Sequence, residues 1–341
     1  MGIMVFSNSH IHDLGFNGGE SDRRQLNIYA SLFEWDSYGF QRIADQGYKG
    51  KAEPARFPLY SVFIRGTSNL TAIPTKYSGF LVSALSLIGF VFILKAYSER
   101  LLDKKLKPNI YFLLIVFACF PTSFFLPIVY SESLFLVISG AALLAHQRDK
   151  YWLSAFFTGL ACLIKVQGVM LIGYFGLKVL IDKGLKFKLR DTVPFLGIFG
   201  LFIYMAFLAK EYGDPLYFIE AQKYWGRLSD NYFMELITSF RPFYLWFTAF
   251  IAIGIKGLTT VPDKAARYSL IAYSLALLFV PVASGSWDSF NRYVLVAFPL
   301  FIGAAIFLQK SNKTTQAVYF ASSGFLLAWY IMLFSNGYWA G

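Results

Sequence analysis

Long apolar runs without charge constrain this chain more than any other feature of its sequence. Ten candidate runs approach the length that crosses a bilayer, and polar connections separate them. They cover residues 77–94, 109–129, 133–145, 151–164, 168–182, 193–209, 242–255, 267–284, 292–309 and 316–335. Only 15% of the residues are charged and 37 are Phe, which excludes a disordered chain and argues against a soluble enzyme. The sequence predicts an all-α, polytopic membrane protein with about ten transmembrane helices.

The positions of Lys and Arg predict an orientation. Alternate short connections hold 16 of these residues, and the intervening short connections hold only Lys165 and Arg292. Positively charged loops stay in the cytoplasm, so the first set of connections is predicted to be cytoplasmic. That set is 95–107, 146–150, 183–191, 256–267 and 310–313. The net charge of +11 is therefore interpreted as a topology signal, and we expect no nucleic-acid partner.

This orientation predicts one domain over residues 1–341. An N-terminal non-cytoplasmic segment (1–76) precedes a helical body (77–335), and a second non-cytoplasmic loop covers 210–241. Residues 1–30 contain no apolar segment typical of a signal peptide. His10 and His12 lie there without enough further ligands for a metal, so we expect no metal site. Cys119 and Cys162 lie in apolar runs, and we expect no disulfide.

Ionisable residues avoid the centres of the apolar runs and gather at their predicted non-cytoplasmic ends. Pumps and coupled transporters usually carry charges inside the membrane, so this distribution argues against an ion-coupled transporter. It suits instead an active site at a membrane surface, for a substrate with its tail in lipid and its head in water. The gathered residues are Glu34, Asp36, Asp45, Arg56, Arg65, Glu132, Lys165, Asp214, Arg227, Arg241, Asp288 and Arg292.

Four ordered blocks contain most of these residues. The first is FEWDSYGFQRIADQGY (33–48), followed by RFPLY (56–60) and Arg65. The second is YSESLF (130–135), followed by KVQG (165–168). The third is GDPL (213–216) with Gln222 and Trp225, and the fourth is NRY (291–293), leading to FPLF (298–301).

Together the blocks resemble the PIG-V-like mannosyltransferases, membrane glycosyltransferases of the GT-C class. The family pattern is similar to WDS-x-x-Y-x-x-I-A-x-x-G-Y, FPLYP, YSES, R-P-Q-G, and P-R-Y with F-P-L. The resemblance implies a helical membrane body with a catalytic Asp in the first non-cytoplasmic loop. It also implies transfer of a sugar, mannose by resemblance, from a polyprenyl-phosphate donor to a hydroxyl of a glycolipid or glycan acceptor, without a metal or other cofactor. In eukaryotes that acceptor is the precursor of the GPI anchor.

The chain departs from the family pattern in three places. The helix that normally precedes the WDS block is missing from residues 1–30, KVQG replaces R-P-Q-G, and NRY replaces P-R-Y. Positive charge is kept in the last two places. The short chain favours a bacterial homologue in the inner membrane, or the endoplasmic reticulum membrane if the protein is eukaryotic.

Asp36 is the candidate catalytic base. Transfer with inversion needs a group that accepts the proton of the attacking hydroxyl. The neighbouring Trp35 offers a face for sugar stacking, and partial desolvation is expected to raise the pKa of Asp36. The structural alternative is a helix cap at the start of a helix over 37–46.

The candidate ligands of the donor phosphate are cationic, since charge on a leaving phosphate needs fixed positive groups. Arg292 and Lys165 end apolar runs on the predicted side, and Arg56 and Arg65 are weaker candidates. The alternative for Arg292 and Lys165 is that they only reach for the membrane interface.

The candidate sugar or acceptor contacts form a looser group. Three of its members have a structural alternative: a helix cap for Glu132, a solvated helix face for Asp45, and interfacial aromatic packing for Trp225. The group is Trp35, Glu132, Asp45, Gln167, Gln222 and Trp225.

Two other functions compete with the glycosyltransferase. One is a lipid-linked-sugar transporter or flippase, which should carry polar groups along its membrane path. The other is a non-catalytic membrane subunit, which would not need Asp36.

Overall fold

Helices form all the regular structure in the part of the chain that this computed structural model describes, which is residues 33, 35–103, 106–227, 237, 239–285 and 287–340. The all-α prediction is therefore confirmed for these residues. His10 and His12 lie outside them. The first half contains α3 (Asp36–Gln46), η3 (Glu53–Ala55), α4 (Pro58–Thr71), α5 (Thr75–Leu101), α6 (Ile110–Ala118), η4 (Ser123–Phe125), α7 (Glu132–Gln147) and α8 (Tyr151–Ile164).

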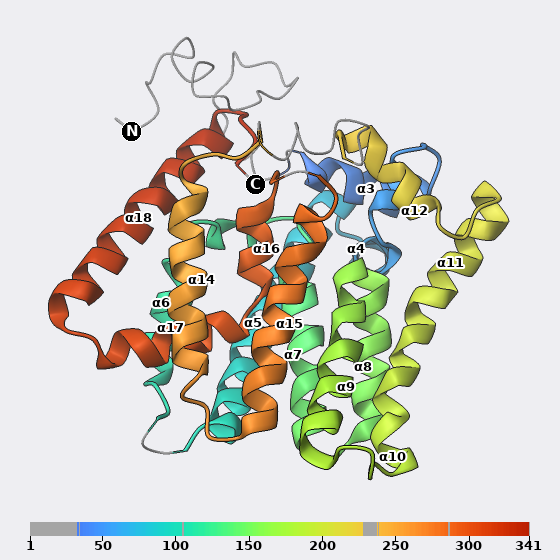
Figure 1. Cartoon of the computed structure of the whole chain (residues 1–341). Helices are drawn as coiled ribbons and strands as arrows, with labels where there is room; N and C mark the ends of the chain where they lie inside the picture. The colour runs from blue at the N-terminus through green and yellow to red at the C-terminus, as the bar shows by residue number, and fades with distance from the viewer. Residues whose placement is uncertain are drawn as a thin grey trace.

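The second half continues the same architecture. Its helices are η5 (Val166–Val169), α9 (Met170–Lys183), α10 (Leu189–Thr192), η6 (Val193–Ile198), α11 (Phe199–Tyr212), α12 (Tyr217–Glu220), η7 (Ala221–Trp225), α14 (Tyr244–Leu258), α15 (Lys264–Val282), α16 (Phe290–Val296), α17 (Pro299–Lys310) and α18 (Lys313–Ser335). Most of the longer helices run side by side as a bundle (Figure 1).

Three described helices are long and apolar enough to cross a membrane, and a bent pair makes a fourth candidate. The three are α5, the continuous stretch from α10 to α11, and α18. The bent pair is α16 with α17, whose axes meet at 80°. The structure therefore supports a multi-pass membrane protein. Helices α7, α8 and α14 are apolar but have at most 16 residues, or about 24 Å, which is short of a hydrocarbon core of about 30 Å.

Two of the predicted runs do not form one continuous helix. In the run 109–129, α6 ends at Ala118 after nine residues, and turns with the short helix η4 follow. In the run 292–309, the chain bends between Val296 and Pro299. Proline has no N–H to donate and is favoured in the first turn of a helix, so Pro299 starts α17 instead of continuing α16.

The Lys- and Arg-rich connections meet at one end of the bundle. A recess of about 650 Å³ there is lined by residues from 99–101, 146–151, 178–191 and Asp263. The backbone N–H of Asn109 donates to Gln309 at 2.8 Å, which adds the last of the five connections to this end. Helices α3, α4 and α12 lie at the opposite end (Figure 1). The side of a membrane that each end faces stays a prediction.

Helix α17 is buried along most of its length. Its residues from Pro299 to Ile306 are buried, and it packs closely against α14. Glycines make this approach possible, because a Cβ on Gly254 would lie 2.7 Å from the backbone oxygen of Leu300. Small residues allow close backbone contact between membrane helices, which interact through packing more than through the hydrophobic effect.

Candidate active site

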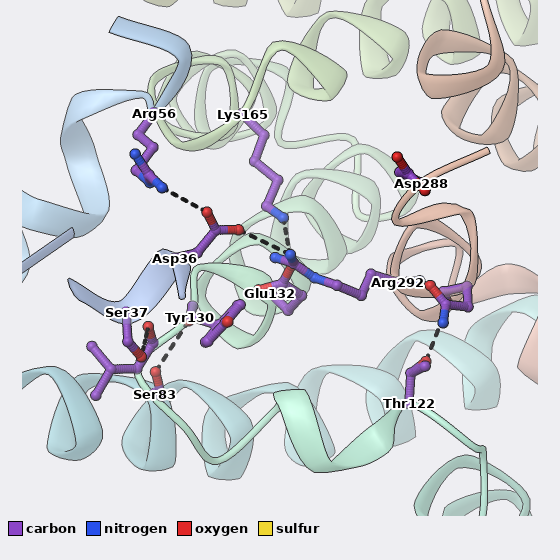
Figure 2. Close-up of polar contacts among 12 residues, drawn as sticks. Asp36, Ser37, Arg56, Ser83, Thr122, Tyr130, Glu132, Lys165, Asp288 and Arg292 are labelled. Carbon is purple, nitrogen blue, oxygen red and sulfur yellow. Dashed lines mark hydrogen bonds and ion pairs between the residues drawn. The ribbon is translucent and has the colours of Figure 1, made fainter. Parts of the chain in front are cut away.

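Five charged side chains that are far apart in the sequence meet at the end of the bundle that carries α3. They are Asp36, Arg56, Glu132, Lys165 and Arg292, and we call them the charge cluster (Figure 2). All five were predicted as site residues. Their formal charges are three positive and two negative, so the cluster carries one uncompensated positive charge.

Ion pairs connect the cluster into one chain. Arg56 Nη2 lies 2.8 Å from Asp36 Oδ1, and Arg292 Nη1 lies 2.9 Å from Asp36 Oδ2. The other end of the Arg292 guanidinium, Nη2, lies 2.7 Å from Glu132 Oε1. Lys165 Nζ lies 2.8 Å from the same Glu132 oxygen. Arg292 therefore joins the two carboxylates.

The two carboxylates differ in their access to solvent. The side chain of Asp36 is 27% exposed and that of Glu132 is 1% exposed. An incoming molecule can reach Asp36, whereas Glu132 lies behind Arg292 and Lys165. Asp36 is therefore suited to touch a substrate, and Glu132 is suited to hold the cations in place.

Asp36 is the first residue of α3 and does not cap it. The N-cap residue is Trp35, and no side-chain cap hydrogen bond is recorded there. Trp35 has φ of 59°, which is uncommon for a residue with a side chain and marks local strain. Next in the chain, Ser37 Oγ donates to the backbone oxygen of Val129 at 3.1 Å and fastens the start of α3 to the segment before α7.

The expected rise in the pKa of Asp36 is not found. Burial does raise the pKa of this carboxyl, but the Arg56 and Arg292 guanidinium groups overcome burial and hold the pKa well below its usual range. The sequence prediction was wrong because it considered desolvation by Trp35 and not the two ion pairs. Asp36 is therefore ionised at neutral pH, as a proton acceptor must be.

Lys165 enters the site through a break in the helices. The residue is extended (φ −153°, ψ 148°) between α8 and η5. Gly168 packs so closely on the end of α8 that a Cβ there would overlap the backbone of Ala161, at 2.6 Å from its oxygen. The KVQG segment therefore folds back on α8, and Lys165 points to Glu132 (Figure 2).

Three aromatic rings surround the Arg292 guanidinium. Its Cζ lies 4.7 Å from the ring centre of Tyr130, 4.9 Å from that of Phe125 and 5.2 Å from that of Trp339. Cation–π contacts of this kind stabilise a desolvated cation. Tyr130 stands in the YSESLF block, but sequence analysis gave it no role. No signal in the sequence pointed to Trp339, which lies 47 positions after Arg292.

The neighbour of Arg292 anchors the short helix α16. The side chain of Asn291 donates to the backbone oxygen of Ala340 at 3.0 Å, and its own backbone oxygen accepts from Thr122 Oγ1 at 3.1 Å. The NRY block therefore positions Arg292 through Asn291, a role that sequence analysis did not assign.

The loop between α3 and α4 carries Arg56 and is held by hydrogen bonds. The hydroxyl of Tyr48 donates to the backbone oxygen of Arg56 at 2.6 Å, and the hydroxyl of Tyr204 donates to the backbone oxygen of Pro54 at 2.8 Å.

Glu53 lies in the same loop. It is buried, pairs with Arg42 at 2.6 Å and accepts from the backbone N–H of Gly50 at 2.7 Å. Sequence analysis missed Glu53, although it is an acidic residue next to a conformationally rigid proline.

Two of the other predicted residues lie apart from the cluster. Arg65 is on the exposed side of α4, and none of the ion pairs found in the described part of the chain involves it. Asp45 is exposed near the end of α3, where it accepts from Thr75 Oγ1 at 3.2 Å. The solvated-face alternative therefore describes Asp45 better than a sugar contact.

The predicted aromatic contacts are already engaged within the protein. Trp35 packs on Trp339 with ring centres 5.3 Å apart. Trp225 lies against Arg56, whose Cζ is 4.4 Å from the ring centre.

The two predicted glutamines lie apart from the charge cluster. Gln167 is buried in η5 and Gln222 is half-buried in η7, and no described side-chain hydrogen bond joins either to the charge cluster.

The composition of the charge cluster suits an anion better than a metal ion. Within the described ranges, no group of three or more His, Cys, Asp and Glu side chains could hold a metal ion. Two guanidinium groups and an ammonium group, arranged around one accessible carboxylate, can instead bind a phosphate beside a proton acceptor.

Comparison with known protein families gives a match over residues 19–225, to the family described as mannosyltransferase (PIG-V). The matched range covers more than half of the chain and includes Asp36, Arg56, Glu132 and Lys165. No curated protein and no solved structure matches the chain. The chain belongs to the PIG-V mannosyltransferase family, and it is thus a glycosyltransferase.

Proposed function

We propose that this mannosyltransferase moves a mannosyl group from a polyprenyl-phosphate mannose to a hydroxyl of a glycolipid or glycan, with inversion at the anomeric carbon. The observation that carries the proposal is the position of Asp36, an accessible carboxylate held between Arg56 and Arg292. A phosphate-linked donor brings the negative charge that the surplus cation of the cluster would balance.

The reaction needs one proton acceptor and one anion site. The acceptor oxygen bonds to the anomeric carbon, and its proton passes to the Asp36 carboxylate. The bond between the anomeric carbon and the phosphate oxygen breaks, and polyprenyl phosphate leaves with the electron pair. Arg292, Lys165 and Arg56 stabilise the charge that grows on this phosphate.

Donor binding would also make Asp36 a better base. The phosphate oxygens would share the guanidinium groups of Arg56 and Arg292, which now lower the pKa of Asp36. The carboxylate would gain basicity when the donor is in place. In this arrangement Glu132 keeps Arg292 and Lys165 oriented and need not contact the sugar.

The proposal includes the membrane setting. Helices α7, α8 and α14 would also lie within the membrane, in one domain with the longer candidate spans. The sequence predicts about ten transmembrane helices in total. The charge cluster would face the non-cytoplasmic side, opposite the Lys- and Arg-rich connections. A donor with its prenyl chain in the outer leaflet would reach Asp36 with its phosphate at the interface.

The test is the variant Asp36→Asn with purified protein and polyprenyl-phosphate mannose. Loss of the base should lower the rate of mannosyl transfer by about 10²-fold or more, measured at a temperature at which the variant is still folded. The control is Glu220→Gln, an exposed carboxylate at the same end of the bundle that pairs with Lys223. Parallel assays with polyprenyl-phosphate glucose and arabinose test the donor sugar. Undiminished transfer by Asp36→Asn would refute the mechanism.

A further inference from the structure

A glycine in α3 lies where the Arg56 side chain crosses the helix. A Cβ on Gly39 would lie 2.6 Å from Arg56 Nε and 2.7 Å from Nη1, and it would overlap Cζ. Gly39 has no positive φ, so the backbone does not require a glycine here. Glycine inside a helix is about 1 kcal/mol less favourable than alanine. What its missing side chain provides is space for the guanidinium.

Trp225 makes a second contact with the same group. Its ring centre lies 4.4 Å from Arg56 Cζ, and its Nε1 donates to the backbone oxygen of Ala52 at 3.4 Å. Trp225 is 46% exposed, whereas Arg56 beside it is 9% exposed. The Trp225 ring, from η7, therefore covers the Arg56 guanidinium, the same group that pairs with Asp36.

We propose that Gly39 and Trp225 are positioning residues of the transfer reaction, which hold the Arg56 guanidinium on the carboxylate of Asp36. Neither residue needs to touch the donor or the acceptor. The inference rests on the proposed role of Asp36, and it replaces the sequence-based interpretation of Trp225 as a sugar contact.

The decisive experiment is a double-mutant cycle on mannosyl transfer from polyprenyl-phosphate mannose. Gly39→Ala should lower the rate by about 10- to 100-fold, since a displacement near 1 Å in a catalytic site can have this effect. In the Arg56→Gln background, Gly39→Ala should have no further effect, because the group that it displaces is gone. The matched control is Gly173→Ala in α9, where a Cβ would meet nothing within 4 Å and the rate should stay at the wild-type level.

A pH profile separates positioning from general damage. When Arg56 leaves Asp36, the pKa of this carboxyl should rise, and the acid limb of the rate should move to higher pH in Gly39→Ala. The other groups around Asp36 are Arg292 from α16 and Tyr130 before α7, with Glu132 behind Arg292, and this variant leaves them unchanged. Gly173→Ala should keep the wild-type profile.

Trp225 variants provide an independent arm if Gly39→Ala does not fold. Trp225→Ala should lower the rate of mannosyl transfer, and Trp225→Phe should keep much of the wild-type rate. In the Arg56→Gln background, neither variant should change the rate further. A wild-type rate for Gly39→Ala, or losses that add to that of Arg56→Gln, would overturn the inference. A loss in Trp225→Ala that persists without Arg56 and raises the KM of the acceptor would instead make Trp225 a sugar contact.

Asp36→Asn, assayed in parallel, separates the two proposals. An inactive Asp36→Asn with a fully active Gly39→Ala refutes only the positioning role. An active Asp36→Asn refutes the proposed function itself.

Discussion

At the scale of single residues, Glu132 is a buried charge that pairs with two cations of the charge cluster. One of its oxygens accepts from both Lys165 and Arg292, and its side chain is almost completely buried. Removal of one partner from a buried ion pair leaves an uncompensated charge, which typically destabilises a protein by about 3–5 kcal/mol. The carboxylate is thus part of the fold as well as of the site.

Glu132→Gln should therefore clearly lower the midpoint of thermal unfolding of the solubilised protein, because Arg292 and Lys165 lose their shared counter-charge. The matched control is Glu99→Gln, which removes a carboxylate from a surface pair with Lys107. Exposed ion pairs of this kind contribute about 0–1 kcal/mol to the free energy of unfolding. Equal midpoints for the two variants would contradict the organising role of Glu132.

The lowered pKa of Asp36 predicts how stability depends on pH. A carboxyl with a depressed folded-state pKa stabilises the fold above its unfolded pKa of about 3.9, and this contribution is lost as the pH falls through the folded-state value. The difference in unfolding midpoint between wild type and Asp36→Asn should thus be constant from about pH 8 to 5 and change only below about pH 4. A change that begins near pH 6 would mean that the pKa is raised instead.

At the scale of helices, the close contact between α14 and α17 keeps the bundle together beneath the site. Gly254 and Gly257 of α14 face Gly303 and Leu300 of α17 at backbone distance. Helix α17 follows α16 after the bend at Pro299, so its placement also sets the direction in which α16 presents Arg292.

Gly257→Ala should therefore destabilise the protein, by about 1–3 kcal/mol as for other overpacked cores. The added methyl would overlap the backbone of Gly303, which has no flexible side chain to move. Gly324→Ala in α18 is the matched control, since a Cβ there would meet nothing within 4 Å. The measurement is thermal unfolding in detergent, and a midpoint unchanged by Gly257→Ala would rule out the tight contact.

At the scale of the whole molecule, charge is divided between two ends. The charge cluster lies at the end with α3, and the recess at the other end collects the Lys- and Arg-rich connections. Figure 1 shows the helical bundle between these ends. The proposed topology, with the charge cluster on the non-cytoplasmic side, requires such a division.

Single cysteines test this topology in sealed membranes. Lys223→Cys, at the end with the charge cluster, should react with an impermeant thiol reagent added outside. Lys186→Cys, at the other end, should react only after the membrane is opened. Both lysines are exposed, and replacement of Cys119 and Cys162 by alanine removes the native thiols. The reverse pattern would invert the orientation, and labelling of both from one side would exclude opposite faces.

The sequence by itself predicted the fold class, an orientation from the Lys- and Arg-rich connections, and a set of site residues that includes the five members of the charge cluster. The length of the apolar runs indicates membrane helices, and the positions of Lys and Arg predict an orientation, because each effect acts residue by residue along the chain. The ordered blocks around Asp36 and Glu132 identified the family for the same reason, since a motif is local in sequence.

Only the tertiary structure decided how those residues divide their roles. The pKa of Asp36 depends on Arg56 and Arg292, which lie 20 and 256 positions away, and the fold alone sets their distances. The space at Gly39 and the packing of Trp339 on Trp35 depend on neighbours from other segments. Electrostatic and packing energies depend on distance in space, and a sequence specifies that distance only after the chain has folded.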